Sequence, residues 1–219
     1  MKLFFVTLII YAVVNLGTYS AGQGNPRLIV TRISDSNDDI VRLIKELGDS
    51  RELVNNKIKA MDFGIFSNTQ VINLQKELDD RRLKRTINDC VSLFNNTINK
   101  LNTELIASSE KDADKRFTYM INEANGFLGE LKIMLANVEG EKLDHEVEAC
   151  KVNPTGCLIA KYSTRITEIN AVSRNDRWLI QSMPFDIYVA VIRPLLNKQI
   201  TTEIFNPVSE CIKRRLDHD

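Results

Sequence analysis

The sequence predicts an all-α fold, an elongated antiparallel helical bundle with coiled-coil-like heptad seams that is stapled by disulfides. Apolar residues recur every three or four positions along most of the 219-residue chain, which is the period of a helix face packed against another helix. The alternation at every second residue that a strand shows is almost absent. Four cysteines behind a secretory N-terminus indicate disulfide bonds.

The first twenty residues have the layout of a cleaved signal peptide. Lys2 precedes an apolar run that ends at Asn15, and small residues follow at Thr18 and Ser20. This run is shorter than the roughly 20 apolar residues of a membrane span. We therefore expect a signal peptide over residues 1–20, with cleavage after Ser20 or, as a second choice, after Gly22, and a secreted, extracellular protein.

Three parts are expected after the signal peptide. A flexible N-terminal segment covers residues 21–34, a helical bundle covers 35–180, and short helices over 181–219 pack on the bundle. The first boundary rests on the polar residues 35–37, which are good helix caps. The connections between the predicted helices look short, which favours antiparallel neighbours.

Four apolar seams define the predicted helices. The first contains Ile40, Ile44, Leu47, Val54, Ile58, Met61 and Ile65. The second begins near Thr69, passes through the charged stretch DDRRLKR, and contains Val71, Leu74, Leu78, Ile87, Val91, Phe94, Ile98, Leu101 and Leu105. The third contains Ala113, Phe117, Met120, Ala124, Phe127, Leu131, Met134 and Val138. The fourth contains Ile159, Tyr162, Ile166 and Ile169. Beyond it, short helices are expected between Trp178, Pro184, Pro194 and Pro207.

The seam residues have more than one interpretation. Residues such as Phe117, Phe127 and Leu131 are expected in the core, because a helix must bury its apolar face to be stable. The alternative is that they line a cavity for an apolar ligand. The seams are also compatible with pairing between chains as a coiled coil.

Cys90, Cys150, Cys157 and Cys211 allow three pairings. The turn-forming stretch Asn-Pro-Thr-Gly lies between the second and third cysteines and favours a chain reversal there. We therefore expect the bonds Cys150–Cys157 and Cys90–Cys211. Each would stabilise the fold by roughly 2–4 kcal/mol.

Two local motifs suggest processing in the secretory pathway. Asn95 lies in an Asn-x-Thr acceptor for N-glycosylation. Arg82, Lys84 and Arg85 form a dibasic stretch of the kind that secretory proteases cleave. We favour the other interpretation of this stretch, a charged helix face stabilised by ion pairs between residues three and four apart, because a protease needs an extended segment and this one looks helical.

Catalysis and nucleic-acid binding are not expected. The 29 basic and 29 acidic side chains balance, so the chain lacks the basic surface that nucleic acid requires. No phosphate-binding loop, metalloprotease motif or nucleophile elbow is present. His145 lies in a carboxylate-rich stretch, which we interpret as a solvated helix face rather than a metal site. We predict no catalytic residue, no metal ligand and no cofactor.

The segments DCVSLFNNTINKL and ACKVNPTGCLIAKY, together with the signal peptide and the long helices, resemble secreted insect proteins with the tsetse EP-protein domain. The resemblance covers residues 86–180. It implies an extracellular binding or structural role in gut, saliva or reproductive secretions.

These observations favour a secreted helical binding or interaction protein without catalysis, whose partner is an extracellular protein or a second copy of the chain. One alternative is a carrier of a small apolar molecule in the bundle core. Another is a membrane-active effector whose amphipathic helices open onto lipid. No membrane span is expected after signal cleavage, because Arg193 and Pro194 interrupt the most apolar later stretch, IYVAVIRPLL.

Overall fold

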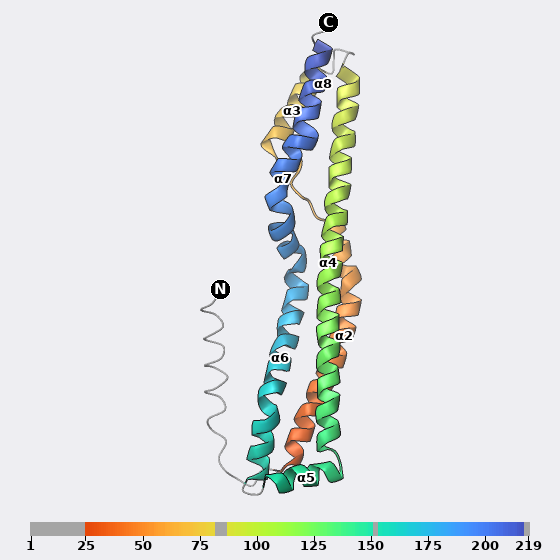
Figure 1. The fold of residues 1–219 in the computed structure, drawn as a ribbon. Coiled ribbons are helices and arrows are strands. Elements are labelled where there is room, and N and C mark those ends of the chain that lie inside the picture. Colours follow the sequence, from red (N-terminus) through yellow and green to blue (C-terminus); the bar gives the residue numbers. More distant parts are fainter. Residues whose placement is uncertain (1–24, 82–86, 151–152, 217–219) are drawn as a thin grey trace. The chain divides into compact units, whose positions relative to one another are not determined.

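The structure, a computed structural model, describes residues 25–81, 87–150 and 153–216. Helix accounts for almost all of these residues, and no strand occurs among them. The predicted all-α helical bundle is therefore confirmed (Figure 1). The expected signal peptide over residues 1–20 lies outside the described residues.

Within the described residues, the helical elements begin with α2 (Arg27–Lys59), α3 (Thr69–Arg81), α4 (Asn88–Val138), α5 (Glu141–Ala149) and α6 (Pro154–Ile187). The helical run then continues without a break through η2 (Tyr188–Ile192), α7 (Arg193–Gln199), η3 (Ile200–Phe205) and α8 (Asn206–Leu216). The elements η2 and η3 are π-helical, with wider turns than an α-helix.

The described residues form two compact units. The first combines the chain up to Ile40 with Phe127–Val172, and the second combines Val41–Gly126 with the chain from Ser173 onward. This division cuts across α2, α4 and α6 and does not follow the expected boundaries after residues 34 and 180.

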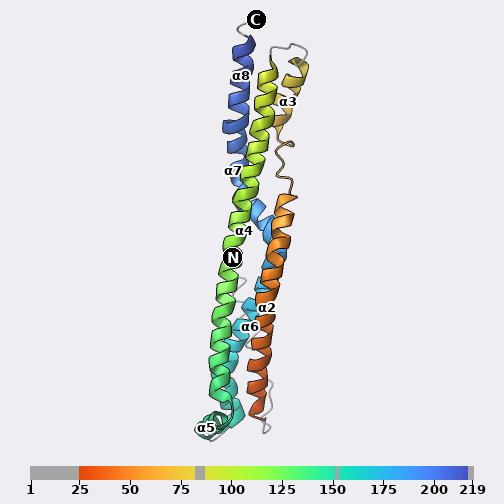
Figure 2. The ribbon, with the colours of Figure 1, turned by 90° about the vertical axis from the view of Figure 1, so that its right-hand side faces the viewer.

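The first unit packs the beginning of α2, the end of α4 and the beginning of α6 around a common core. Its buried apolar residues are Ile29, Ile33, Ile40, Leu131, Val138, Leu158, Tyr162, Ile166 and Ile169. Helix α5 lies across the ends of α4 and α6 in both ribbon views (Figures 1 and 2). Gly140 makes the turn into α5 with a positive φ of 56°, a conformation that side chains with a Cβ rarely adopt.

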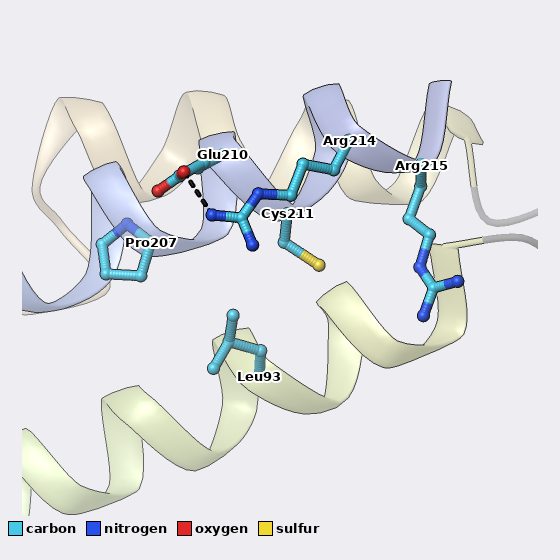
Figure 3. A pocket seen from close by; sticks show the side chains of 6 residues that line it. All are labelled: Leu93, Pro207, Glu210, Cys211, Arg214 and Arg215. Atoms are coloured by element: carbon cyan, nitrogen blue, oxygen red, sulfur yellow. Dashed lines mark hydrogen bonds and ion pairs between the residues drawn. The ribbon is translucent and has the colours of Figure 1, made fainter. Parts of the chain in front are cut away.

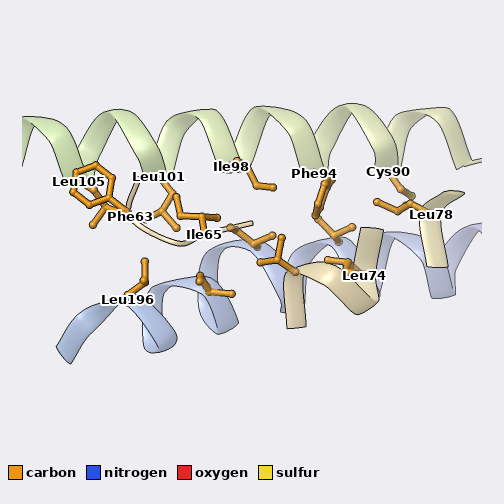
Figure 4. Close-up of a cluster of buried hydrophobic side chains, with 14 of the residues drawn as sticks. Phe63, Ile65, Leu74, Leu78, Cys90, Phe94, Ile98, Leu101, Leu105 and Leu196 are labelled. Carbon is orange, nitrogen blue, oxygen red and sulfur yellow. The ribbon is translucent and has the colours of Figure 1, made fainter. Parts of the chain in front are cut away.

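The second unit has a continuous core in which α3, α4 and the C-terminal helices meet (Figure 4). The connection between α2 and α3 contributes Phe63 and Ile65, both buried. The other members are Val71, Leu74, Leu78, Ile87, Cys90, Phe94, Ile98, Leu101, Leu105, Ile192, Leu196, Ile200, Ile204, Val208 and Ile212. Most of the predicted second seam is therefore core.

The predicted start of the first helix was wrong. Helix α2 begins at Arg27, so residues 27–34 of the segment expected to be flexible are helical. Ile29 and Ile33 are fully buried and extend the heptad spacing of Ile40 toward the N-terminus. Packing of this apolar face, rather than a cap at residues 35–37, explains the earlier start.

Two seam positions were predicted one residue too late. Leu43 is buried where Ile44 was expected, and Leu158 is buried where Ile159 was expected; Ile44 and Ile159 are both partly exposed. In each case two apolar residues are adjacent in the sequence. Local spacing cannot choose between such neighbours, because the orientation of the whole helix decides which one faces the core.

The second and third predicted runs divide differently in the structure. Helix α3 ends at Arg81 as a separate element, while α4 continues through residues 106–112, which separate the two runs in the sequence. Ser109 occupies the seam there. It is buried, and its hydroxyl donates a hydrogen bond to the Leu105 carbonyl at 2.8 Å. A small polar residue thus keeps the helix packed where apolar spacing lapses.

The C-terminal prolines do not separate short helices, contrary to expectation. Pro184 lies inside α6, and each of the other two follows a π-helix. The residue before each of these two prolines donates a backbone hydrogen bond to the carbonyl five residues earlier. Arg193 donates to the Tyr188 carbonyl, and Asn206 donates to the Thr201 carbonyl. Because proline lacks an N–H and its ring crowds the carbonyl four residues earlier, a wider turn lets the helix continue.

Candidate functional site

The four cysteines form the two bonds that the turn chemistry favoured. Cys90 is joined to Cys211, which links α4 to α8 in the second unit. Cys150 is joined to Cys157, which links the end of α5 to the first turn of α6. No cysteine is free, so none is available as a nucleophile or metal ligand.

Of the other predicted site residues, Asn95 alone lies in the part of the chain that the structure describes. Asn95 is exposed on α4 beside the buried Phe94, so its amide lies on the outer face of that helix. Arg82, Lys84 and Arg85 lie outside the described residues. His145 is exposed on α5, and no group of three potential metal-ligating side chains occurs in the described part of the chain.

Two of the three core candidates are fully buried. Phe117 and Leu131 have no exposed surface, as expected for core residues. Phe127 is only partly buried, and the Arg165 guanidinium lies 5.5 Å from the centre of its ring. Arg165 also donates two hydrogen bonds of 2.8 Å to the carboxylate of Glu130. Phe127 is therefore at the edge of the first unit, under a cation, rather than inside a cavity.

One hollow in the second unit lies between α4 and α8 and has a volume of about 530 Å³ (Figure 3). Its lining mixes Leu93 and Pro207 with Glu210, Arg214 and Arg215 around the disulfide-bonded Cys211. Both arginines are already paired, Arg214 with Glu210 and Arg215 with Asp89. The lining is too charged to suit an apolar ligand.

A second groove, of about 280 Å³, lies between α2 and α6 in the first unit. Its lining mixes hydroxyl, amide, charged and aliphatic groups and consists of Arg32, Asp35, Ser36, Ser163, Ile166, Thr167 and Asn170. The Asn170 amide donates a hydrogen bond to the Ser36 hydroxyl at 3.1 Å across the groove. This lining is mixed, with polar groups beside aliphatic ones.

One acidic residue is buried in the seam of α6. Asp176 is 3% exposed, next to the buried Ser173. Arg177 follows Asp176 in the sequence, and its guanidinium forms an ion pair with the carboxylate of Glu46 on α2 at 2.7 Å. Burial and the negative charge of Glu123 raise the pKa of the Asp176 carboxyl. The burial of Asp176 could have been predicted from the sequence, because residue 176 lies one heptad after Ile169. The apolar pattern is weak after Ile169, so this position was not recognised as part of the seam.

Three exposed apolar residues lie on the same helical run. Trp178, Phe185 and Val189 are 62%, 68% and 38% exposed. Their spacings of seven and four residues place them on one side of the helical run, and we call these three residues the apolar ridge. Met183, Ile187 and Ile192 alternate with them and are buried on the opposite side. The end of α6 and the start of η2 are therefore apolar on both sides.

Sequence reasoning missed the ridge because it treated Trp178 and the prolines as helix boundaries. Once the helix is known to be continuous, two apolar stripes are visible in the stretch WLIQSMPFDIYVAVI. Leu195 on α7 is also exposed, at 51%. The signal was present in the composition, but it could be interpreted only with the correct helix boundaries.

The run Pro154–Leu216 also contains a stretch that is long and apolar enough to cross a membrane, judged by length and composition alone. Only 22% of that stretch is buried. The helical run continues through Arg193 and Pro194.

Comparisons of the chain with protein-family models, curated proteins and solved structures find no match.

Proposed function

We propose that the chain is a secreted helical binding protein of an extracellular fluid, that it acts through the outer face of its C-terminal helical run, and that it performs no catalysis. The single observation that carries this proposal is the apolar ridge. Exposed aromatic side chains are costly in water and are typical of binding surfaces. The ridge contains the only tryptophan of the chain.

The extracellular part of the proposal rests on two features. Two disulfides tie the chain together, and disulfides persist mainly in oxidising compartments. The sequence of residues 1–20 has the layout of a signal peptide. The resemblance to secreted insect proteins with the tsetse EP-protein domain agrees with a role in gut, saliva or reproductive secretions.

The carrier alternative has less support. An apolar carrier needs an enclosed, mainly apolar cavity. The hollow between α4 and α8 has charged side chains in its lining, and the groove between α2 and α6 has a mixed one. Phe117 and Leu131 are packed in the core. An outer helix face is therefore the better candidate for the binding surface.

Secretion is tested by expressing the full chain in cultured insect cells. We expect protein in the medium that begins at residue 21, or at residue 23 for the second cleavage site, and carries two disulfides. A glycan at Asn95 would add mass that Asn95→Gln removes. Protein retained inside the cells with residues 1–20 attached would refute the extracellular assignment.

Surface binding is tested with a photo-crosslinking amino acid in place of Phe185. Thr118, exposed on α4 and outside the ridge, is the matched control position. In the fluid where the protein accumulates, we expect crosslinked partners from position 185 and few from position 118. Equal crosslinking from both positions would contradict a binding role for the ridge.

An apolar fluorescent probe distinguishes binding at the surface from ligand uptake in the bundle core. A carrier would take up the probe in the bundle and would release it to fatty acids, and Phe185→Ser would leave this uptake unchanged. The proposed function predicts no such stoichiometric, displaceable uptake.

A further inference from the structure

Helix α5 is weakly anchored by its own side chains. None of its nine residues is buried, and Leu143, Glu146 and Val147 are its partly buried ones. A helix of this length is unstable in water by itself, because isolated helices shorter than about 12–15 residues are marginal. To keep its place across the ends of α4 and α6, α5 therefore depends on links to its neighbours (Figures 1 and 2).

An ion pair and a disulfide link α5 to the start of α6. The Lys161 ammonium donates hydrogen bonds to both carboxylate oxygens of Glu146, at 2.8 and 2.7 Å. Cys150, which follows α5 directly, is bonded to Cys157. The ion pair and the disulfide are four residues apart on each side, so they join the same faces of the two helices. The Lys161 side chain is 50% exposed, which lets solvent screen the ion pair and leaves the disulfide as the stronger link.

The two disulfides of the chain differ in their access to solvent. Cys157 is exposed on α6, and Cys150 is 8% exposed at the end of α5. Cys90 has no exposed surface and belongs to the apolar core of the second unit. Its partner Cys211 is partly exposed, but a thiolate that attacked the Cys211 sulfur would expel the Cys90 thiolate into that core. Apolar surroundings disfavour a thiolate, so exchange at Cys90–Cys211 is hindered.

We propose that Cys150–Cys157 is a redox switch that holds α5 folded when it is closed and releases α5 when a low-molecular-weight thiol, such as reduced glutathione, opens it. Exposed disulfides are the ones that exchange readily with thiols. With the bond open, α5 keeps a solvent-screened ion pair and no buried side chain, so it loses its helical structure. The switch is independent of the apolar ridge and of any partner that the ridge binds.

The reduction proceeds in two exchange steps. A thiolate of the reductant attacks the exposed Sγ of Cys157, forms a mixed disulfide there, and releases Cys150 as a thiolate that takes up a proton. A second thiolate attacks the reductant's own sulfur in the mixed disulfide, so that Cys157 also leaves as a thiolate and is protonated. Two reductant thiols are thereby oxidised to one disulfide while the protein gains two thiols.

Graded reduction of the purified full chain tests the selectivity of the switch. The protein is incubated with reduced glutathione, free thiols are alkylated at intervals, and the peptide of each cysteine is quantified by mass spectrometry. We expect Cys150 and Cys157 to be alkylated at least about tenfold faster than Cys90 and Cys211, because exchange depends on access to the attacked sulfur. The Cys90–Cys211 bond is the internal control. Equal rates, or earlier opening of Cys90–Cys211, would overturn the proposal.

Hydrogen exchange tests the release of α5. In protein with Cys150–Cys157 open, the amides of Glu141–Ala149 should lose at least about tenfold of their protection, as expected for a locally unfolded segment. The amides of residues 94–105 on α4 should keep theirs. The double variant Cys150→Ser with Cys157→Ser should show the same pattern without reductant. Glu146→Gln, which removes the ion pair and keeps the bond, should change the protection of α5 by about fivefold or less.

Two results of the exchange measurement would overturn the switch. Unchanged protection of α5 in the reduced protein would mean that other contacts hold the helix. Loss of protection in residues 94–105 as well would mean that the bond supports the whole fold rather than α5.

Discussion

Burial, reinforced by the negative charge of Glu123 on α4, raises the pKa of the Asp176 carboxyl on α6 to about 6. The ordinary value is 3.8, so the folded protein holds this proton more tightly than the unfolded chain does. Between these two values the free energy of unfolding falls as the pH rises. The loss is on the order of 3 kcal/mol, because each pKa unit corresponds to about 1.4 kcal/mol.

Asp176→Asn should remove this loss. Urea unfolding at a series of pH values from about 4 to 7 should show near-equal stability of the two proteins at the acidic end. At neutral pH the variant should be the more stable. Asp114→Asn is a control that should have the opposite effect and lower the stability at neutral pH. Arg51 lowers the pKa of Asp114 and so stabilises its charged form. If Asp176→Asn destabilised the protein at neutral pH, burial would not be what disfavours the charged form of the carboxyl at position 176.

The ion pair between Arg165 and Glu130 should make a small, salt-sensitive contribution to the first unit. The Arg165 guanidinium lowers the pKa of Glu130 by hydrogen bonding, so the pair stabilises the fold above the ordinary pKa of 4.5 and is lost as the pH falls. Both side chains are 41% exposed, which allows solvent to screen the charges. Glu130→Gln should cost at most about 1 kcal/mol at low salt and less at high salt. A loss that is large and independent of salt would point to packing rather than charge.

The two disulfides should differ in their effect on stability. Cys90 and Cys211 are 121 residues apart, and Cys150 and Cys157 are seven apart. Because a bond across a longer loop removes more entropy from the unfolded chain, replacing the first pair by serines should cost about 5 kcal/mol and replacing the second about 2–3 kcal/mol. Urea unfolding of the two double variants measures this difference. The reverse order would contradict the loop-entropy explanation.

Phe117→Ala tests whether the third seam is packed core. Phe117 has no exposed surface, so its removal should cost about 3–5 kcal/mol through lost burial and the cavity left behind. Phe127→Ala should cost clearly less, because Phe127 is partly exposed. Comparable costs, or a variant at position 117 that is as stable as the original chain, would indicate a preformed cavity.

The sequence predicted the helical fold and the favoured cysteine pairing because both depend on local signals. Heptad spacing places Phe94, Ile98 and Leu101 on one helix face, and the Asn-Pro-Thr-Gly turn brings Cys150 and Cys157 together. With that turn closed by one bond, Cys90 and Cys211 were the only cysteines left to pair.

The remaining features depended on packing that local signals do not encode. Leu43 and Ile44 are equally apolar, and only contact with the other helices selects Leu43 for the core. Prolines 194 and 207 look like helix breaks in the sequence, and the π-helices that accommodate them have no simple sequence pattern. The apolar ridge was missed because its stripe crosses Pro184, which was expected to separate two helices but lies inside α6.

Oxidative footprinting by hydroxyl radicals tests the binding role of the ridge most directly. Trp178 and Phe185 are 62% and 68% exposed, and Tyr119, at 66%, is a control of matched exposure on another helix. The isolated secreted protein is compared with the same protein in the fluid where it accumulates. We predict that Trp178 and Phe185 become protected in the fluid while Tyr119 stays equally reactive. Unchanged labelling of Trp178 and Phe185 would contradict a binding surface at the ridge.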